Sequence, residues 1–191
     1  MLNSKRWNII LASKSPRRKQ LLEQLGYSFT QKSKDTDESF SMEMPQREVA
    51  EYLSKKKAAA FAAEMERNDL LIASDTIVLI ENEILNKPSN SKEAFKMIAK
   101  LSGKKHEVIT GVCIKSTEKE VSFSVSTSVF FKQLKEEEIN YYVEKYQPFD
   151  KAGAYGIQEW IGLIGVDKIK GSFYNVMGFP AKEVYEAIEH F

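Results

Sequence analysis

The sequence is poor in the residues that build cysteine and histidine centres. Cys113 is the only cysteine among 191 residues, which excludes an intramolecular disulfide framework and any zinc or iron–sulfur site made from several cysteines. His106 and His190 are the only histidines, and no His-Glu-x-x-His zinc motif occurs. A cytoplasmic location is the default expectation for such a chain.

Long apolar runs and an excess of one charge are also absent. No stretch approaches the ~20 apolar residues that span a bilayer. The run from Asn8 to Ala12 is too short for the core of a signal peptide. Lys and Arg number 28 against 27 Asp and Glu, so the formal net charge is only +1. We therefore expect neither a membrane nor nucleic acid as a partner.

Two common nucleotide-binding motifs are missing as well. The sequence has no Gly-x-x-x-x-Gly-Lys-Ser/Thr loop and no Gly-x-Gly-x-x-Gly, which excludes a P-loop enzyme and a Rossmann dinucleotide site. Its composition, with 42% hydrophobic and 29% charged residues, is that of an ordinary globular protein. Without repeats, low-complexity segments or linkers, residues 1–191 are expected to form one domain.

One short stretch organises the rest: residues 11–18, Leu-Ala-Ser-Lys-Ser-Pro-Arg-Arg. The apolar run from Trp7 to Ala12 predicts a buried strand. Ser15 in the N-cap position and Pro16 in the first turn predict a helix that follows directly and ends at Gly26.

Arg17 and Arg18 would then lie in the first turn of that helix, where the helix dipole already contributes positive charge. Together with free backbone N–H groups and serine hydroxyls, the two guanidinium groups suit an anion such as a phosphate chain. The alternative, that both arginines pair with surface carboxylates, stays open at this point.

A carboxylate interrupts the next apolar run. The segment from Leu70 to Ile80 predicts a buried strand, and Asp75 lies within it. A buried carboxylate is costly unless it is paired, hydrogen-bonded or bound to a metal, which favours a functional role for Asp75. By contrast, Glu38 belongs to the polar loop from Gln31 to Met44, for which a solvated surface loop is the simpler interpretation.

Lys57 lies on the apolar stripe of a helix predicted from Pro45 to about Arg67. Its spacing of four from Leu53 and Phe61 places all three on one face. Either the ammonium group reaches the solvent at the edge of the helix, or it points into a cleft and meets an anion.

The other elements follow from helical and alternating periodicity and from turn residues. Together they indicate an α/β fold. Strands are predicted at Tyr27–Thr30, Ile84–Leu85, His106–Lys115, Val121–Lys132 and Trp160–Gly165, and helices at Asn90–Gly103, Lys135–Tyr146 and from Pro180 to the C-terminus.

Cations and carboxylates without a cysteine or a pair of histidines are typical of phosphoryl chemistry with a hard metal ion. Mg²⁺ or Mn²⁺ takes one or two protein carboxylates and completes its shell with water and phosphates. A nearby carboxylate can take the proton from an attacking water. The candidates are the cations Arg17, Arg18, Lys57 and Lys87 and the carboxylates Glu38 and Asp75.

Several motifs in order resemble the Maf family, also called septum-formation-inhibitor Maf-like proteins, over nearly the whole chain. This resemblance implies a mixed twisted sheet with flanking helices and two lobes around a central cleft, a fold shared with inosine-triphosphate pyrophosphatases. The motifs are residues 11–18, Asp37-Glu38, Lys57-Ala58, Ser74-Asp75-Thr76, Lys87-Pro88, Leu101-Ser102-Gly103 with His106, Thr110-Gly111, residues 150–158 (Asp-Lys-Ala-Gly-Ala-Tyr-Gly-Ile-Gln) and residues 171–178 (Gly-Ser-Phe-Tyr-Asn-Val-Met-Gly).

The resemblance implies a nucleoside triphosphate pyrophosphatase that uses a divalent metal ion to cleave between the α- and β-phosphates. Asp75 resembles the general base, and it shares the metal ion with Glu38. Lys57 and Lys87 resemble further cleft residues of the family, and we group them with Asp75 and Glu38 as catalytic candidates that help to hold the triphosphate. The resemblance places the substrate at Ser13, Arg17, Arg18, Thr76 and Gln158, of which Arg17, Thr76 and Gln158 set substrate choice.

Residues 150–158 resemble the branch that acts on dTTP and UTP. The amide of Gln158 offers both a donor and an acceptor, which suits the imide edge of thymine or uracil. Glu159 stands where glycine is frequent in this branch. Modified pyrimidine nucleotides, a 7-methyl-GTP pyrophosphatase and a non-catalytic nucleotide-binding regulator of cell division remain alternatives, and the resemblance is compatible with a homodimer.

Overall fold

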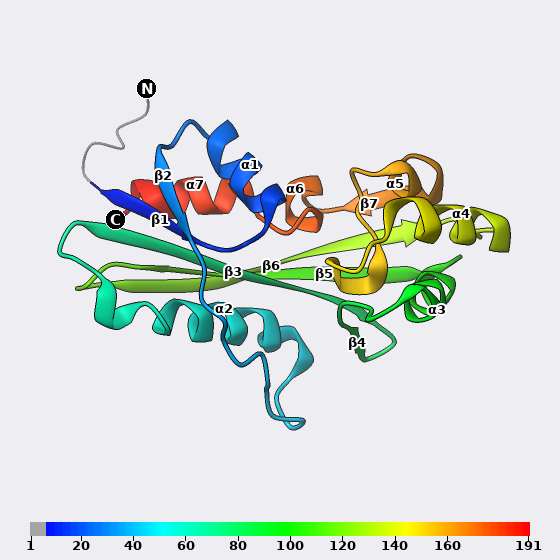
Figure 1. Ribbon diagram of the computed structural model, residues 1–191, viewed down its shortest axis with the longest axis horizontal. Coiled ribbons are helices and arrows are strands. Elements are labelled where there is room, and N and C mark those ends of the chain that lie inside the picture. The colour runs from blue at the N-terminus through cyan, green and yellow to red at the C-terminus, as the bar shows by residue number, and fades with distance from the viewer. Residues whose placement is uncertain (1–6) are drawn as a thin grey trace. The chain divides into compact units, whose positions relative to one another are not determined.

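The computed structural model describes residues 7–191, which form an α/β fold (Figure 1). Strands and helices alternate along most of the chain. In order, the elements are β1 (Asn8–Ala12), α1 (Pro16–Gln24), β2 (Phe29–Lys32), the 3-10 turn η2 (Gln46–Glu48), α2 (Val49–Ala59), η3 (Ala62–Glu64), β3 (Asp69–Ile80), β4 (Glu83–Leu85), α3 (Ser91–Leu101), β5 (Lys105–Lys115), β6 (Glu120–Phe131), α4 (Glu136–Tyr146), η4 (Ala152–Ala154), α5 (Trp160–Gly165), β7 (Val166–Lys170), α6 (Phe173–Val176) and α7 (Ala181–Glu189).

The strands form one mixed sheet in the order β2-β1-β3-β5-β6-β7, with β4 paired to β3. β1 runs parallel to both β2 and β3, whereas β4 is antiparallel to β3 and β7 is antiparallel to β6. The predicted α/β fold with a mixed sheet and flanking helices is confirmed.

Contacts divide the chain into two compact units. Unit 1 contains Asp75 and the described residues before it, together with Thr110–Val125 and Gly178–Phe191. Unit 2 contains Thr76–Ile109 and Ser126–Met177. The long strands β3, β5 and β6 contribute residues to both.

In unit 1, α1 and α7 lie on one side of the sheet and α2 lies on the other (Figure 1). The α2 side packs Ala58 and Phe61 against Leu71, Ala73 and Cys113 of the sheet. Because these side chains are small or apolar and fully covered, α2 has a fixed position under β3. Cys113 is the small core residue that its position in a strand predicts.

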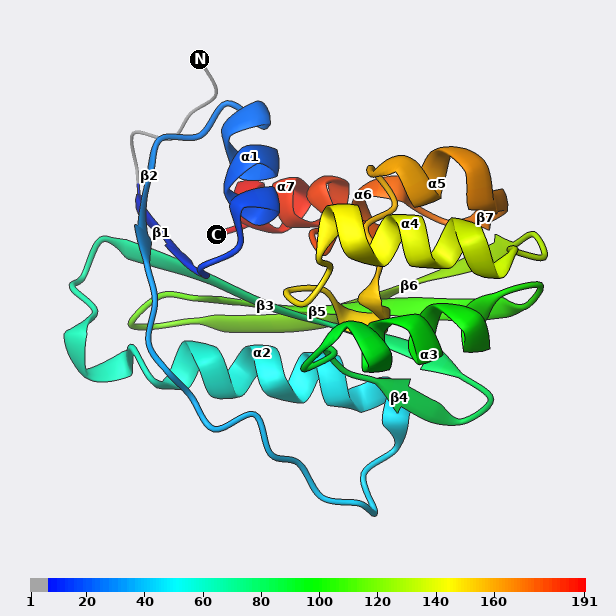
Figure 2. The ribbon, with the colours of Figure 1, turned by 45° about the vertical axis from the view of Figure 1, so that its right-hand side comes forward.

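In unit 2, α3 and α4 lie side by side (Figure 2). Their buried faces share one core with the second half of β3 and the C-terminal part of β6. Ile98 and Leu101 of α3 and Ile139 and Tyr142 of α4 belong to this core. The rings of Tyr141 and Trp160, 4.8 Å apart, connect α4 to α5.

The helix predicted from Pro45 to Arg67 is shorter than expected. A 3-10 turn precedes α2, and α2 itself ends at Ala59. Lys34 Nζ donates to the carbonyl of Ala60 at 2.7 Å and so satisfies an acceptor that further helix would have used. Phe61 then turns into the core beneath the sheet.

The prediction of a strand at Trp160–Gly165 is wrong, because this segment is the helix α5. A short apolar run cannot be assigned to strand or helix by periodicity alone. In α5 the apolar side chains do not share one environment: Ile161 is buried and Leu163 is 81% exposed. The lysine-containing edge strand β7 follows it and was not predicted, and β2 lies at Phe29–Lys32, two residues later than expected.

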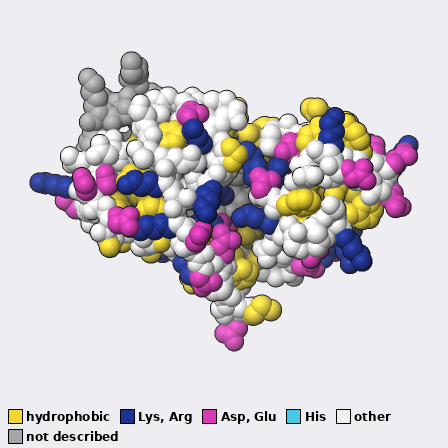
Figure 3. Space-filling model, in the orientation of Figure 1, with side chains coloured by type: hydrophobic (Ala, Val, Ile, Leu, Met, Phe, Trp, Pro, Cys, Tyr) yellow, Lys and Arg dark blue, Asp and Glu magenta, His cyan; other side chains and the backbone are white. Residues whose placement is uncertain are grey.

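Lysine and arginine side chains are interspersed with aspartate and glutamate on the face drawn in Figure 3. That face therefore carries no continuous basic surface. Among residues 7–191, no helix combines the length and the apolar character needed to cross a membrane.

Candidate active site

The site in unit 1 is built where β1 ends. β1 pairs with β3 up to Ala12 and Ala73, and β3 then continues to Asp75 without β1 beside it. The chain leaves β1 through Ser13 and enters α1, so a helix N-terminus follows the carboxyl end of a parallel strand. Such an edge is where α/β sheets commonly bind ligands.

The first turn of α1 is arranged as the sequence predicts. The Ser15 hydroxyl accepts a hydrogen bond from Arg18 N at 3.4 Å, with Pro16 at the start of the helix. Ser13 is buried, and its hydroxyl accepts from Ser15 N at 3.1 Å. Gln31 Nε2 holds the Ser13 carbonyl at 2.7 Å. The turn between β1 and α1 is therefore fixed from both sides.

Lys57 joins two carboxylates. Its ammonium group lies 2.8 Å from Glu38 Oε1 and forms a close ion pair with Asp75 Oδ1. Lys57 and Asp75 are largely covered, with side chains 17% and 13% exposed, while that of Glu38 is 51% exposed. Lys57 was expected either to reach solvent or to meet an anion. In the structure it meets two anions, the carboxylates of Glu38 and Asp75.

A second lysine fixes the acidic loop next to this cluster. Lys56 Nζ pairs with Asp37 Oδ2 at 2.7 Å and also donates to the Ser39 carbonyl at 3.1 Å. These bonds, with those from Ser39, hold the pKa of Asp37 far below its usual range. Consecutive lysines of α2 thus bind consecutive acidic residues of the loop, which brings Glu38 to Lys57.

Arg18 lies between three segments of unit 1. Its Nε donates to the Gly178 carbonyl at 2.9 Å, and its Nη1 donates to the Ser74 carbonyl at 2.7 Å. Burial lowers the pKa of the Arg18 guanidinium, and the Asp75 carboxylate opposes that shift. Arg17, on the same helical turn, is half-buried. The Gly178 contact joins residues 160 positions apart, which no local pattern in the sequence could show.

The other three predicted residues belong to unit 2. Thr76 is half-buried and follows Asp75 directly in β3, so the two side chains leave opposite faces of the strand. Lys87 is exposed just after β4, and Gln158 is exposed just before α5. Gly153 N donates to the Asn86 carbonyl at 3.2 Å, which joins the segment of Gln158 to the residue preceding Lys87.

The donor set fits a hard metal ion that arrives with its substrate. Among the described residues, no group of three or more His, Cys, Asp or Glu is placed to hold a metal ion. Glu38 and Asp75 nevertheless converge on one cation, the Lys57 ammonium. Mg²⁺ is usually held by one or two carboxylates plus substrate phosphates rather than by a complete protein cage, so these two carboxylates suit it.

Comparison with known proteins identifies the family. The sequence profile described as Maf-like protein matches residues 8–191. The chain belongs to the Maf family. The family predicted from the sequence motifs is thereby confirmed.

Several relatives of this chain share one name. A Bacteroides thetaiotaomicron protein named dTTP/UTP pyrophosphatase is 50% identical over 184 residues, covering 96% of this chain and 95% of its own. A Parabacteroides distasonis protein of the same name is 48% identical over 190 residues, covering 99% and 98%. A third, from Cytophaga hutchinsonii, is 52% identical over 182 residues, covering 95% and 83%.

The fold of this Maf-family chain also matches a solved structure. The Ham1 protein of Staphylococcus aureus superimposes with a TM-score of 0.55, over 96% of this chain and 98% of the other. At 15% sequence identity, this similarity shows a common fold.

Proposed function

We propose that this Maf-family protein is a nucleoside triphosphate pyrophosphatase that converts dTTP and UTP to the monophosphate and pyrophosphate. The observation that carries the proposal is the position of Lys57 between Glu38 and Asp75. The guanidinium of Arg18, in the first turn of α1, also interacts electrostatically with both carboxylates. Relatives that are 48–52% identical over nearly the whole of this chain carry the name dTTP/UTP pyrophosphatase, which agrees with this chemistry.

Glu38 and Asp75 would hold Mg²⁺ or Mn²⁺ together with the substrate phosphates. When bound, such an ion neutralises phosphate charge and makes the α-phosphorus more electrophilic. The Lys57 ammonium lies between the same two carboxylates and keeps them from repelling each other.

Asp75 is the proposed general base. Its carboxylate takes the proton from the water that attacks the α-phosphorus, and pyrophosphate leaves. Lys57 holds this carboxylate through Oδ1, so the proton acceptor has a defined orientation. Preorganisation of this kind lowers the cost of reaching the transition state.

The triphosphate would bind at the start of α1. Ser13 and Arg17 lie there, and Arg18 is already anchored by the Ser74 and Gly178 carbonyls. An anchored guanidinium loses little conformational entropy when an anion binds. By resemblance to the family, Lys87 is proposed to contact the phosphates, and Thr76 and Gln158 are proposed to contact the nucleoside.

Replacement of Asp75 tests the assignment of the base. Asp75→Asn retains the side-chain size but cannot accept the proton, so turnover of dTTP should fall on the order of a hundredfold or more while nucleotide still binds. The control is Asp35→Asn, which alters an exposed acidic residue of the loop whose partner, Lys14, is exposed as well. Anion-exchange separation of the products measures both rates. Unchanged turnover in the Asp75 variant would remove the proposed base.

A further inference from the structure

The Gln158 amide alone does not distinguish thymine or uracil from cytosine. The amide carries a donor and an acceptor, and rotation about the terminal torsion exchanges them. In one orientation the amide matches the imide edge of thymine and uracil, and in the other it matches the amino and ring nitrogens of cytosine. Selection between these bases therefore requires contacts that hold Gln158 in one conformation. Gln158 lies near the end of the segment formed by residues 150–159. We call this segment the 150–159 loop.

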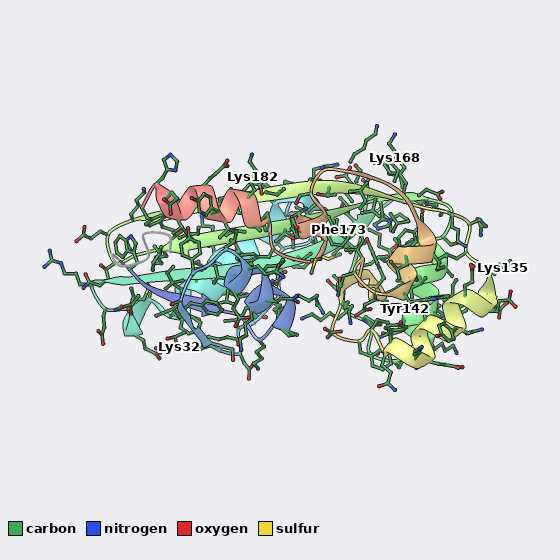
Figure 4. The ribbon with its side chains drawn as sticks, turned by 90° about the horizontal axis from the view of Figure 1, so that it is seen from above. Lys32, Lys135, Tyr142, Lys168, Phe173 and Lys182 are labelled. Atoms are coloured by element: carbon green, nitrogen blue, oxygen red, sulfur yellow. The ribbon has the colours of Figure 1, made fainter. Side chains whose placement is uncertain are left out.

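A buried hydroxyl connects the middle of this loop to its end. Tyr142, fully buried on α4, donates from its hydroxyl to Glu159 Oε2 in a close hydrogen bond. The same hydroxyl accepts from the Gly156 N–H at 3.0 Å. Figure 4 labels Tyr142 on α4 beside the ribbon of the loop. One hydroxyl thus contacts the backbone at Gly156, before Gln158, and the side chain of Glu159, after it.

An ion pair connects the end of the loop to its beginning. Lys151 Nζ lies 3.1 Å from Glu159 Oε1 and 2.7 Å from Asp150 Oδ1. The Lys151 side chain is only 9% exposed and that of Glu159 is 20% exposed, so the pair is largely desolvated. Loss of Lys151 would remove the cation that compensates the covered Glu159 carboxylate, which is costly. The Glu159 carboxylate therefore ties Lys151 and Tyr142 together.

The backbone within the loop is strained. Ala154 is completely buried and has a φ of +60°, a conformation that residues with a Cβ seldom adopt. Such strain persists only where the surroundings dictate the conformation, and it is concentrated at functional sites. The contacts of Lys151 and the Tyr142–Gly156 hydrogen bond hold the loop on either side of Ala154.

The Gln158 amide lies against the same network. A Cβ placed on Gly156 would lie 2.8 Å from Glu159 Cδ and 3.0 Å from Gln158 Nε2. Both side chains therefore fold over the face of Gly156 that glycine leaves open. The position of the amide depends on the Gly156 backbone, and Tyr142 holds that backbone.

We infer that Tyr142, Lys151 and Glu159 are positioning residues that fix Gln158 and thereby set the preference for thymine and uracil over cytosine. This inference rests on the proposed function, because it concerns the selectivity of that same reaction. It assigns the preference to a three-residue network and not to Gln158 alone.

The test compares Tyr142→Phe and Glu159→Gln with wild type, using kcat/KM for dTTP and for dCTP. Tyr142→Phe removes one hydroxyl and leaves the Gly156 N–H without its acceptor. We expect the ratio of the two kcat/KM values to fall at least tenfold, mainly through a higher KM for dTTP. Matched controls are Tyr141→Phe, an exposed neighbour on α4, and Glu144→Gln, an exposed carboxylate of the same helix.

A purely structural role predicts a different result. Damage to the fold lowers turnover of dTTP and dCTP together, so an unchanged ratio in both folded variants would overturn the inference and leave the proposed function intact. Should Tyr142→Phe fail to fold, Glu159→Gln decides, since it keeps the size of the side chain and removes its charge. If wild type hydrolyses neither nucleotide, the proposed function fails and the inference fails with it.

Discussion

Lys57 is the residue whose role the sequence left most open. The stripe that it shares with Leu53 and Phe61 placed it on the core face of α2, but periodicity does not tell whether a lysine there reaches solvent or a partner. The structure pairs it with Glu38 and Asp75, which are 19 and 18 positions away. Contacts of that sequence separation depend on tertiary packing.

Replacing Lys57 should separate binding of the metal ion from catalysis. In Lys57→Met, the Glu38 and Asp75 carboxylates lose their shared cation, so Mn²⁺ should bind the nucleotide-free protein several-fold more tightly in calorimetry. Turnover of dTTP should nevertheless fall on the order of a hundredfold, because a preorganised positive charge is lost. Lys55→Met, which removes an exposed lysine of the same helix, should stay within a few-fold of wild type. Equal Mn²⁺ affinities in all three proteins would contradict the shared-cation arrangement.

His106 makes a second residue-scale prediction, about stability. Its Nε2 lies 2.7 Å from the Tyr155 hydroxyl in the core of unit 2, and burial lowers its pKa to about 4. Below pH 6.5 the His106 imidazole is therefore protonated in the unfolded chain. In the folded chain it stays neutral until the pH is near 4. Stability is lost as pH falls through that window, by about 2 kcal/mol between pH 7 and pH 4.5.

Urea unfolding of His106→Gln at those two pH values checks this. The variant retains a group that can bond Tyr155 but does not titrate, so its unfolding free energy should depend less on pH by about that amount. If wild type and variant showed the same pH dependence, the pKa of His106 would be equal in the folded and unfolded states and burial would not lower it. His190, which is exposed, serves as the control position for the same substitution.

At the scale of elements, local chemistry predicted the termini of helices better than the class of short segments. Ser15, Pro16 and Gly26 correctly bracketed α1, and Asn90 caps α3 through the Glu93 N–H. The failure was α5, where six residues carry too little periodicity to separate helix from strand.

Gly111 shows an element-scale constraint that local patterns could not reveal. It appeared only as part of a family motif, whereas the structure shows the backbone of α2 lying directly on it. A Cβ at this position would lie 2.2 Å from the Ala50 carbonyl carbon and oxygen. Backbone atoms inside a helix cannot move aside as a flexible side chain can.

Gly111→Ala should therefore destabilise the protein by about 3 kcal/mol or more, at the upper end of the cost of overpacking. Gly165→Ala is the matched control, because its Cβ would meet only side-chain atoms, Leu134 Cδ2 at 3.2 Å and Ile161 Cγ1 at 3.7 Å. Thermal unfolding of both variants makes the comparison. A Gly111 variant as stable as the Gly165 variant would show that α2 does not lie so close to β5.

At the scale of the whole molecule, composition predicted the broad class and the family motifs predicted the fold. The near balance of charges agrees with the mixed surface in Figure 3. A single Maf-like domain over residues 1–191, two lobes around a central cleft, a homodimer, a cytoplasmic location and the absence of nucleic-acid binding stay predictions. Composition constrains such properties only loosely, because they depend on surfaces and partners that a single sequence does not specify.

The central claim is the reaction itself, and product analysis over a panel of nucleoside triphosphates tests it most directly. With Mg²⁺ or Mn²⁺ present, dTTP and UTP should yield monophosphate and pyrophosphate, while purine nucleotides and metal-free samples should yield neither. Preferential turnover of 7-methyl-GTP would contradict the pyrimidine assignment of Gln158. No turnover of any nucleotide would contradict the enzymatic account and favour a nucleotide-binding regulator.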